Sequence, residues 1–330
     1  MTFPGRPGRE AGEKGQAMKT YLVTGGAGFI GSHLVEELVN RGDHVRVMDN
    51  FLTGKRENIE PFLGSIDLIE GDICDYEACL HAADGVDYVL HQAALPSVPR
   101  SVEDPQTTDA INIRGTLNML MAASRSRAKK FVFASSSSVY GDDEELPKRE
   151  GKEGNPLSPY ALSKLVGEKY CWIFNSLYKL PTVSLRYFNV FGPRQDPFSL
   201  YAAAVPNFIT LVLQGKSPRI FGDGEQSRDF TYVANVVDAN LLAAESGDRA
   251  SGEAFNIACA ERITVNALLA QIKDITGSRV PPVYEPPRPG DIRHSFADIS
   301  KAGRLMEYKP RVGFREGLDR TISWYMERSL

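Results

Sequence analysis

The chain has 330 residues, of which 42% are hydrophobic and 24% are charged, and its formal net charge is −4. A chain of this length can bury a large core and is expected to form two lobes. The mildly acidic balance and the lack of a basic stripe argue against nucleic acid as the main partner. We find no signal peptide and no apolar run of about 18 residues, so we expect a cytoplasmic protein without a membrane anchor. The four cysteines lack metal-ligand spacing, and no metal site is expected.

Residues 1–18 differ from the rest of the chain. They are rich in glycine and charged residues, lack periodicity, and end on Met18 just before the first predicted strand. We expect a disordered leader or an alternative start of translation.

The first folded segment predicts a nucleotide site. Residues 21–23 read as a short buried strand, Gly25, Gly28 and Gly31 follow at three-residue spacing, and residues 32–40 carry an apolar stripe at helical period. Glycines in such a turn let the backbone approach a pyrophosphate, whose charge lies on the helix N-terminus. A glycine triplet alone is weak evidence, because a Gly-rich turn also occurs in unrelated folds.

The second strand strengthens this prediction and indicates which dinucleotide binds. Residues 44–48 alternate as a strand and end on Asp49, close to where a dinucleotide fold places an acid on the adenosine ribose. A carboxylate accepts hydrogen bonds from a 2′-hydroxyl but repels a 2′-phosphate, which favours NAD over NADP. Lys55 and Arg56 lie nearby and could hold a phosphate, although a solvated loop fits them better.

The alternation of strand and helix continues. Further strands are predicted at residues 67–69, 88–91, 130–135 and 182–186. This pattern predicts an α/β fold, a doubly wound parallel (Rossmann) sheet with a smaller C-terminal α/β substrate lobe. The expected domains are an NAD-binding part at 19–188, with 233–260 returning to it, and a substrate-binding lobe made of 189–232 and 261–330.

Tyr160 and Lys164 carry the expected chemistry. Spaced by four on a predicted helix, they lie on one face about a turn apart. A cation about 4 Å from a phenol, at an effective dielectric of about 20, contributes roughly 4 kcal/mol, on the order of three pKa units toward phenolate. Such a Tyr-x-x-x-Lys pair also arises by chance on amphipathic helices. Here strand 130–134 delivers Ser135–Ser138 to the carboxyl edge of the sheet, where a nicotinamide and this helix should meet.

Five segments in order carry a family resemblance: TGGAGFIG, SSSSVYG, YALSK, LRYFNVFGPRQ and GDGEQSRDFTYV. From about Lys19 almost to the C-terminus, the chain resembles the extended short-chain dehydrogenase/reductase family. Within it, the chain is most similar to the UDP-hexose 4-epimerases, particularly the branch acting on UDP-N-acetylhexosamines.

The resemblance implies roles for particular residues. Ser136, Tyr160 and Lys164 would be catalytic, with Tyr160 as the base, Ser136 as hydroxyl donor, and Lys164 both lowering the Tyr160 pKa and holding the nicotinamide ribose. The implied NAD contacts are Gly25, Gly28, Phe29, Ile30, Gly31, Asp49, Asn50, Asp72, Ile73, Gln92, Ala93, Ala94, Asn112, Tyr160, Lys164 and Tyr187. The implied UDP-sugar contacts are Ser136, Ser137, Asn189, Arg228, Arg288 and Ser295. For Arg228, a surface ion pair with Asp229 is the alternative, and His91 is expected to be a packed strand-end residue.

The implied reaction is 4-epimerisation of a UDP-hexose by tightly bound NAD. Tyr160 would remove the C4 hydroxyl proton while hydride passes to NAD, and the 4-keto sugar would turn over and take the hydride back on its other face. A homodimer through the Tyr160 helix is a further family expectation. A 4,6-dehydratase or decarboxylase is opposed by Ser137 and Ser138, where those enzymes hold acidic residues. A non-catalytic nucleotide sensor is opposed by the presence of Tyr160 and Lys164.

Ser295 bears on the choice of sugar. In epimerases restricted to UDP-Glc and UDP-Gal, the corresponding position holds a tyrosine that closes the pocket near C2. The serine implies space for an acetamido group, and thus UDP-GlcNAc and UDP-GalNAc alongside the non-acetylated pair. The alternative is a small loop residue whose space its neighbours refill, and an enzyme restricted to the non-acetylated sugars.

Overall fold

The computed structural model describes residues 18–197, 203–287 and 293–328. The predicted leader, apart from Met18, and the predicted diphosphate ligand Arg288 lie outside these residues. Among the described helices, none is both long enough and apolar enough to cross a membrane.

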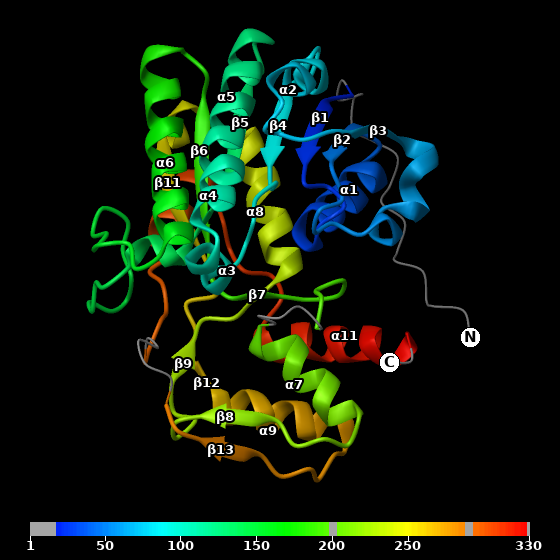
Figure 1. Cartoon of the computed structure of the whole chain (residues 1–330), viewed down its shortest axis with the longest axis vertical. Helices are drawn as coiled ribbons and strands as arrows, with labels where there is room; N and C mark the ends of the chain where they lie inside the picture. The colour runs from blue at the N-terminus through cyan, green and yellow to red at the C-terminus, as the bar shows by residue number, and fades with distance from the viewer. Residues whose placement is uncertain (1–17, 198–202, 288–292, 329–330) are drawn as a thin grey trace.

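A seven-stranded parallel sheet forms the larger part of the molecule (Figure 1). In spatial order its strands are β11 (Glu253–Ile257), β6 (Thr182–Tyr187), β5 (Lys130–Ser136), β4 (Tyr88–His91), β1 (Thr20–Thr24), β2 (His44–Asp49) and β3 (Ile66–Glu70). Each neighbouring pair is parallel. The predicted fold class is therefore confirmed, and each strand predicted for the sheet is present.

Helices cover both faces of the sheet because side chains alternate along each buried strand. On β1, Val23 packs in the core cluster shared with α1 (Phe29–Arg41), α8 (Val233–Glu245) and α10 (Ser300–Met306). Its neighbour Leu22 faces the other cluster, shared with α2 (Tyr76–Ala83), α5 (Thr116–Arg125) and α6 (Pro159–Leu177). The carboxyl ends of the strands are thereby left open between the two helical layers.

Short elements connect the strands and the longer helices. Helices α3 (Val98–Glu103) and α4 (Pro105–Asp109) follow β4, and a π-helical turn over Ala110–Gly115 leads into α5. The 3-10 turns are Arg56–Asn58, Glu60–Ser65, Ser137–Tyr140 and Asp248–Ala250.

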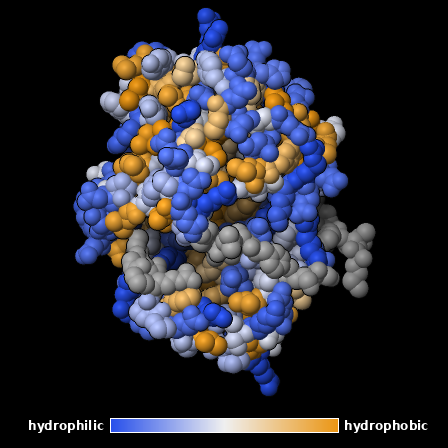
Figure 2. All heavy atoms as spheres, in the orientation of Figure 1, coloured by the Kyte–Doolittle hydropathy of each residue, from blue (hydrophilic) through white to orange (hydrophobic). Residues whose placement is uncertain are grey.

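A smaller lobe lies below the sheet in Figure 1. It consists of α7 (Ala204–Leu213), α9 (Val265–Thr276), α11 (Phe314–Glu327), and the strand pairs β7 (Val190–Phe191) with β10 (Thr231–Tyr232), β8 (Arg219–Phe221) with β13 (Val283–Glu285), and β9 (Ser227–Arg228) with β12 (Ile263–Thr264). Its own apolar core includes Phe191, Phe230 and Phe314. Figure 2 shows a recess in the surface at the level where this lobe meets the sheet.

The chain crosses between the two parts more often than expected. Helix α8 and strand β11 pack with the large sheet. Helix α10, which the sequence had placed in the lobe, also packs there, because Ala302, Met306 and Tyr308 are buried in the core beside α8. Tyr308 donates a hydrogen bond of 3.0 Å to the carbonyl of Ala258, just after β11.

Candidate active site

A cavity of about 960 Å³ opens at the carboxyl edge of the sheet, against the smaller lobe. Its size is at the upper end of the usual range for a bound small molecule. The predicted residues that line it are Gly25, Gly28, Phe29, Ile30, Gly31, Asp49, Asn50, Asp72, Ile73, Gln92, Ala93, Ala94, Ser136, Ser137, Tyr160, Lys164, Tyr187 and Asn189. Asn112, Arg228 and Ser295 are not among the lining residues.

The glycine turn forms one wall of the cavity. Gly25 has a φ of +66°, and a Cβ at Gly31 would lie 2.1 Å from the Gly25 carbonyl oxygen, so a side chain at either position would break the turn. Helix α1 begins directly after Gly28, and the first N–H groups of a helix have no partner within it. This wall is suited to a pyrophosphate.

Asp49 is held in place at the end of β2. Its carboxylate accepts hydrogen bonds from the N–H groups of Ala27, at 2.9 Å, and Phe51, at 2.8 Å. Burial raises the pKa of Asp49, and the two backbone hydrogen bonds lower it in part. The neighbouring cations have acidic partners: Lys55 pairs with Asp196 and Arg56 with Glu70. This wall is suited to a ribose diol more than to a further phosphate.

The predicted catalytic residues converge on the same cavity. Helix α6 begins at Pro159, capped by Ser158, whose hydroxyl accepts a hydrogen bond of 3.1 Å from the N–H of Ala161. Tyr160 therefore lies in the first turn, and it lines the cavity together with Ser136 at the end of β5. Lys164 is one turn further along, nearly fully buried, with Nζ 5.9 Å from the centroid of the Tyr160 ring.

The electrostatics of this pair differ from the sequence prediction. Burial raises the pKa of Tyr160, and the neighbouring Ser136 hydroxyl opposes that rise. Lys164 donates its hydrogen bond to the carbonyl of Ala134, at 2.8 Å, rather than to the phenol. The net direction of the shift is therefore opposite to the predicted one, because removal of the phenol from water has the largest effect. Burial also lowers the pKa of Lys164 to about 8.

The four serines have different environments. The Ser136 hydroxyl accepts a hydrogen bond of 3.2 Å from the N–H of Ser138 and faces the cavity, as Ser137 does. Ser138 does not line the cavity, and its hydroxyl is buried without a hydrogen-bond partner in the described part of the chain. Ser135 donates to Glu168 instead, at 2.5 Å.

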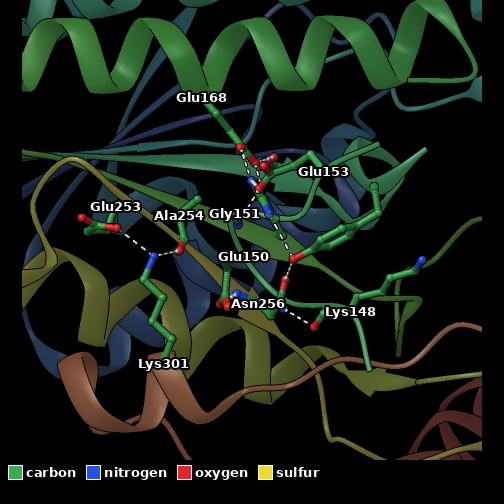
Figure 3. Close-up of polar contacts among 12 residues, drawn as sticks. Lys148, Glu150, Gly151, Glu153, Glu168, Glu253, Ala254, Asn256 and Lys301 are labelled. Carbon is green, nitrogen blue, oxygen red and sulfur yellow. Dashed lines mark hydrogen bonds and ion pairs between the residues drawn. The ribbon is translucent and has the colours of Figure 1, made fainter. Parts of the chain in front are cut away.

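A buried polar network behind the serines was missed by sequence reasoning. Arg186 on β6 makes a two-pronged ion pair with Glu168 on α6, with bonds of 2.8 and 2.7 Å, and a second pair of 2.5 Å with Glu153. Its remaining nitrogen donates to the Tyr140 hydroxyl at 3.0 Å, and Tyr140 donates to Asn256 on β11 at 2.7 Å. Figure 3 shows Glu168 reaching down from its helix toward Glu153, with Asn256 on the far side of the network. Glu168 follows Lys164 by four residues, and this spacing is the sequence signal that could have found it.

A second buried network lies behind the cofactor wall. The ring of His91 is bonded to Thr24 at 2.8 Å and to Thr116 at 3.1 Å, and burial lowers its pKa to about 3. Because the Thr116 hydroxyl donates to the carbonyl of Asn112, at 2.6 Å, it accepts from Nε2 of the neutral imidazole. His91 is thus a packed strand-end residue, as expected, but with two polar partners that the sequence did not indicate.

Asn112 differs from its predicted role. It lies in the π-helical turn, nearly fully buried, and its amide is used within the protein. It accepts from the N–H of Leu95 at 2.7 Å and donates to the hydroxyl of Ser163, on α6, at 3.1 Å. Its contacts fix the loop after β4 against the helix of Tyr160, so Asn112 supports the cavity from behind.

Tyr187 is hydrogen-bonded to Asn240, a residue that the sequence did not indicate as part of the site. Its hydroxyl bonds to Gln92, at 3.2 Å, and to the buried Asn240 of α8, at 2.9 and 3.1 Å. The Gln92 side chain donates a hydrogen bond of 3.0 Å to the side-chain oxygen Oδ1 of Asn240, so the three side chains are bonded to one another. These contacts fix the cavity wall formed by the ends of β4 and β6.

The predicted substrate residues form a group around β9 and β10. The side chain of Asn189 donates to the carbonyl of Asp229 at 3.2 Å, while Arg228 and the N–H of Ser295 both donate to the carbonyl of Ser227, at 2.9 and 3.0 Å. The alternative of a surface ion pair between Arg228 and Asp229 is wrong. Asp229 is fully buried, and its carboxylate accepts hydrogen bonds from the backbone N–H groups of Cys259, at 2.9 Å, and Ala297, at 3.2 Å.

Comparison with known proteins identifies the family. Residues 21–258 match the model of the NAD dependent epimerase/dehydratase family. The chain belongs to this family. The match covers the glycine turn, Asp49, the serines and the Tyr160 helix, and NAD is the family's cofactor.

Particular relatives cover nearly the whole chain. It is 42% identical to a putative UDP-glucose 4-epimerase of Methanocaldococcus jannaschii, over 92% of this chain and 97% of that protein. It is 35% identical to a UDP-N-acetyl-alpha-D-glucosaminuronate decarboxylase of Bacillus cytotoxicus, over 94% and 98%. The solved structure of UDP-N-acetylglucosamine 4-epimerase from Methanobrevibacter ruminantium M1, in complex with UDP-N-acetylmuramic acid, matches with a TM-score of 0.90 at 42% identity, over 95% of this chain and 100% of that one.

Proposed function

We propose that this chain is a UDP-sugar 4-epimerase with tightly bound NAD. The observation that carries the proposal is the meeting of Ser136, Tyr160 and Lys164 in the cavity that also contains the glycine turn and Asp49. Two of the relatives above are named as 4-epimerases of UDP-sugars, which supports this substrate class.

The chain's residues would handle the proton of the reaction. Tyr160, as phenolate, would accept the proton of the sugar C4 hydroxyl, and the Ser136 hydroxyl, which faces the same cavity, would hold that oxygen in line. When bound, oxidised NAD supplies the hydride acceptor and a positive charge. A positive charge beside the phenol lowers the Tyr160 pKa, so the phenolate that accepts the proton is more populated when the site is loaded. Lys164 has ammonium hydrogens left after its bond to Ala134 and can hold a ribose hydroxyl.

The decarboxylase among the relatives makes that reaction the alternative. Ser137 lines the cavity at a position where decarboxylases usually hold a glutamate, and a serine hydroxyl cannot do acid and base work near neutral pH. This favours epimerisation. A non-catalytic nucleotide sensor is opposed by the complete set of Ser136, Tyr160 and Lys164 in one cavity.

For the sugar itself, we propose the UDP-GlcNAc/UDP-GalNAc pair, with UDP-Glc/UDP-Gal as additional substrates. The support is the small side chain of Ser295, which lies beside Ser227 and the Arg228 side chain through its backbone bond. A serine there leaves room that a tyrosine would fill. UDP-glucose 4-epimerisation restricted to the non-acetylated pair is the alternative.

The test is incubation of the purified protein with UDP-Glc, UDP-Gal, UDP-GlcNAc and UDP-GalNAc in separate reactions, with the products identified by NMR. We expect interconversion within both pairs without added NAD. Release of CO₂ from a UDP-uronic acid, with no change in any of the four hexoses, would instead establish the decarboxylase.

A further inference from the structure

The short loop Pro193–Asp196, here called the clasp loop, follows β7 and lines the cofactor cavity from the side of the smaller lobe. Arg194, Gln195 and Asp196 belong to the cavity lining together with Gly28 and Lys55 of the cofactor walls. The loop therefore borders the same cavity as the residues that are suited to a dinucleotide.

The clasp loop is fastened to helix α1 by two contacts. Arg194 donates a hydrogen bond of 2.6 Å to the carboxylate of Glu36, and the ring of His33 donates one of 2.9 Å to the carbonyl of Pro193. Burial lowers the pKa of His33 to about 4, so the ring is neutral near neutral pH and donates from Nε2. These two hydrogen bonds tie the clasp loop to helix α1, whose N-terminus faces the cavity.

The other side of the loop is tied to the wall that holds Asp49. Asp196 pairs with Lys55 at 3.7 Å, and Lys55 lies in the segment that follows β2. Two further hydrogen bonds fix Gln195, from its side chain to the Val190 carbonyl at 3.1 Å and from the Tyr325 hydroxyl to its own carbonyl. The clasp loop thus joins α1, the segment after β2, and α11.

Glu36 is the critical partner in this arrangement. The Arg194 side chain is only 14% exposed, and Nη1 of its guanidinium is buried without a hydrogen-bond partner among the described residues. Without Glu36, the guanidinium would lose its acceptor in a site from which water is largely excluded, which is costly for a charged group. Glu36 itself does not line the cavity.

We infer that the Arg194–Glu36 pair is a cofactor-retaining contact: it holds the clasp loop across the cavity and so slows the release of NAD. Arg194 is a positioning residue in this scheme, and no contact of its own with NAD is required. The inference rests on the proposed function, because an epimerase must keep NADH in place until the ketone is reduced.

The test measures NAD release from the holoenzyme, by dilution into an NAD-consuming enzyme, for wild type, Glu36→Gln, and the control Glu37→Gln on the exposed side of α1. We expect about tenfold faster release for Glu36→Gln, corresponding to roughly 1.4 kcal/mol, unchanged release for the control, and recovery of turnover when NAD is added. Asp196→Asn should accelerate release less, because its pair with Lys55 is more exposed.

A double-variant cycle separates this role from simple loss of stability. Glu36→Gln and Arg194→Gln should not be additive in the rate of NAD release, because either one breaks the same contact. Wild-type release rates in Glu36→Gln, even with a lowered melting temperature, would overturn the inference. Absence of any sugar turnover by wild type would instead count against the proposed function and leave the release rates interpretable.

Discussion

Ser135 donates a hydrogen bond of 2.5 Å to Glu168, so the end of strand β5 is tied to helix α6 one turn beyond Lys164. The same carboxylate holds the guanidinium of Arg186 on β6. The relative position of Ser136 and Lys164 is therefore set by a buried charge network and by the packing of the helix on the sheet.

Loss of Glu168 should be costly. Glu168→Gln leaves the Arg186 guanidinium with a weaker partner in the core, and breaking a buried pair typically costs about 3–5 kcal/mol. Glu145→Gln is the control, because its pair with Lys152 is exposed and worth at most about 1 kcal/mol. Denaturant unfolding of both variants makes the comparison, and equal losses would show that the network is not stabilising.

Replacement of the base separates the roles of three residues. Tyr160→Phe keeps the ring and removes the proton acceptor, so the turnover rate should fall by at least ~10²-fold. Ser136→Ala should also be slow, because the Ser136 hydroxyl lines the same cavity as the Tyr160 phenol. Ser138→Ala should have a small effect, since Ser138 does not line the cavity. Steady-state kinetics with one UDP-sugar suffices, and similar small effects at all three positions would contradict the assignment.

Cofactor retention is a prediction for the wild-type protein. Protein purified without nucleotide should release NAD on acid denaturation, at a good fraction of one per chain, and should turn over without supplementation. The measurement is enzymatic quantification of the released NAD. A fully apo preparation that requires free NAD and accumulates free NADH would point to a dehydrogenase.

Substrate choice should depend on one side chain. Ser295→Tyr adds bulk next to the Ser227 backbone and should selectively abolish turnover of UDP-GalNAc while UDP-Gal is retained. Ser295→Ala is the control, because it keeps the space. If wild type converts UDP-Gal and leaves UDP-GalNAc unchanged, Ser295 does not determine the size of the sugar pocket.

Asp229 predicts a pH dependence of stability. Burial raises its pKa to about 6, above the 3.8 of an ordinary aspartate. The folded protein then binds the proton more tightly than the unfolded chain, so this contribution to the free energy of unfolding is present below pH 3.8 and is lost as the pH rises through 6. The shift corresponds to roughly 3 kcal/mol at most.

Comparison with Asp229→Asn isolates this group. In wild type, Asp229 makes the free energy of unfolding fall between pH 4 and 7. In Asp229→Asn this fall should be absent, whether or not the variant is less stable than wild type at every pH. Asp274→Asn, which removes an exposed carboxylate, should leave that slope as in wild type. Parallel pH profiles for wild type and Asp229→Asn would show that Asp229 does not titrate in this range.

The sequence predicted the local part of the site and missed the long-range part. Gly25 and Gly31 belong to a tight turn, and Asp49 lies at the end of a strand. Glycine spacing and hydrophobic periodicity in the sequence are enough to predict both features. Asn240 lies 148 residues from Gln92, its partner at 3.0 Å, and no local pattern indicates such a pair. The direction of the Tyr160 pKa shift was misjudged for the same reason. Burial of the phenol depends on the whole fold, and the spacing of Tyr160 and Lys164 along one helix gives no information about it.

The return of α10 to the sheet has a consequence for how such a protein can change its specificity. The smaller lobe is built from segments on both sides of α8–β11 and of α10, so it is not a continuous stretch of chain. It cannot be exchanged as a cassette by recombination at a single junction. Exchange of the lobe would need several matched junctions, so point substitutions within the intact scaffold are the simpler route for engineering a new preference into this chain.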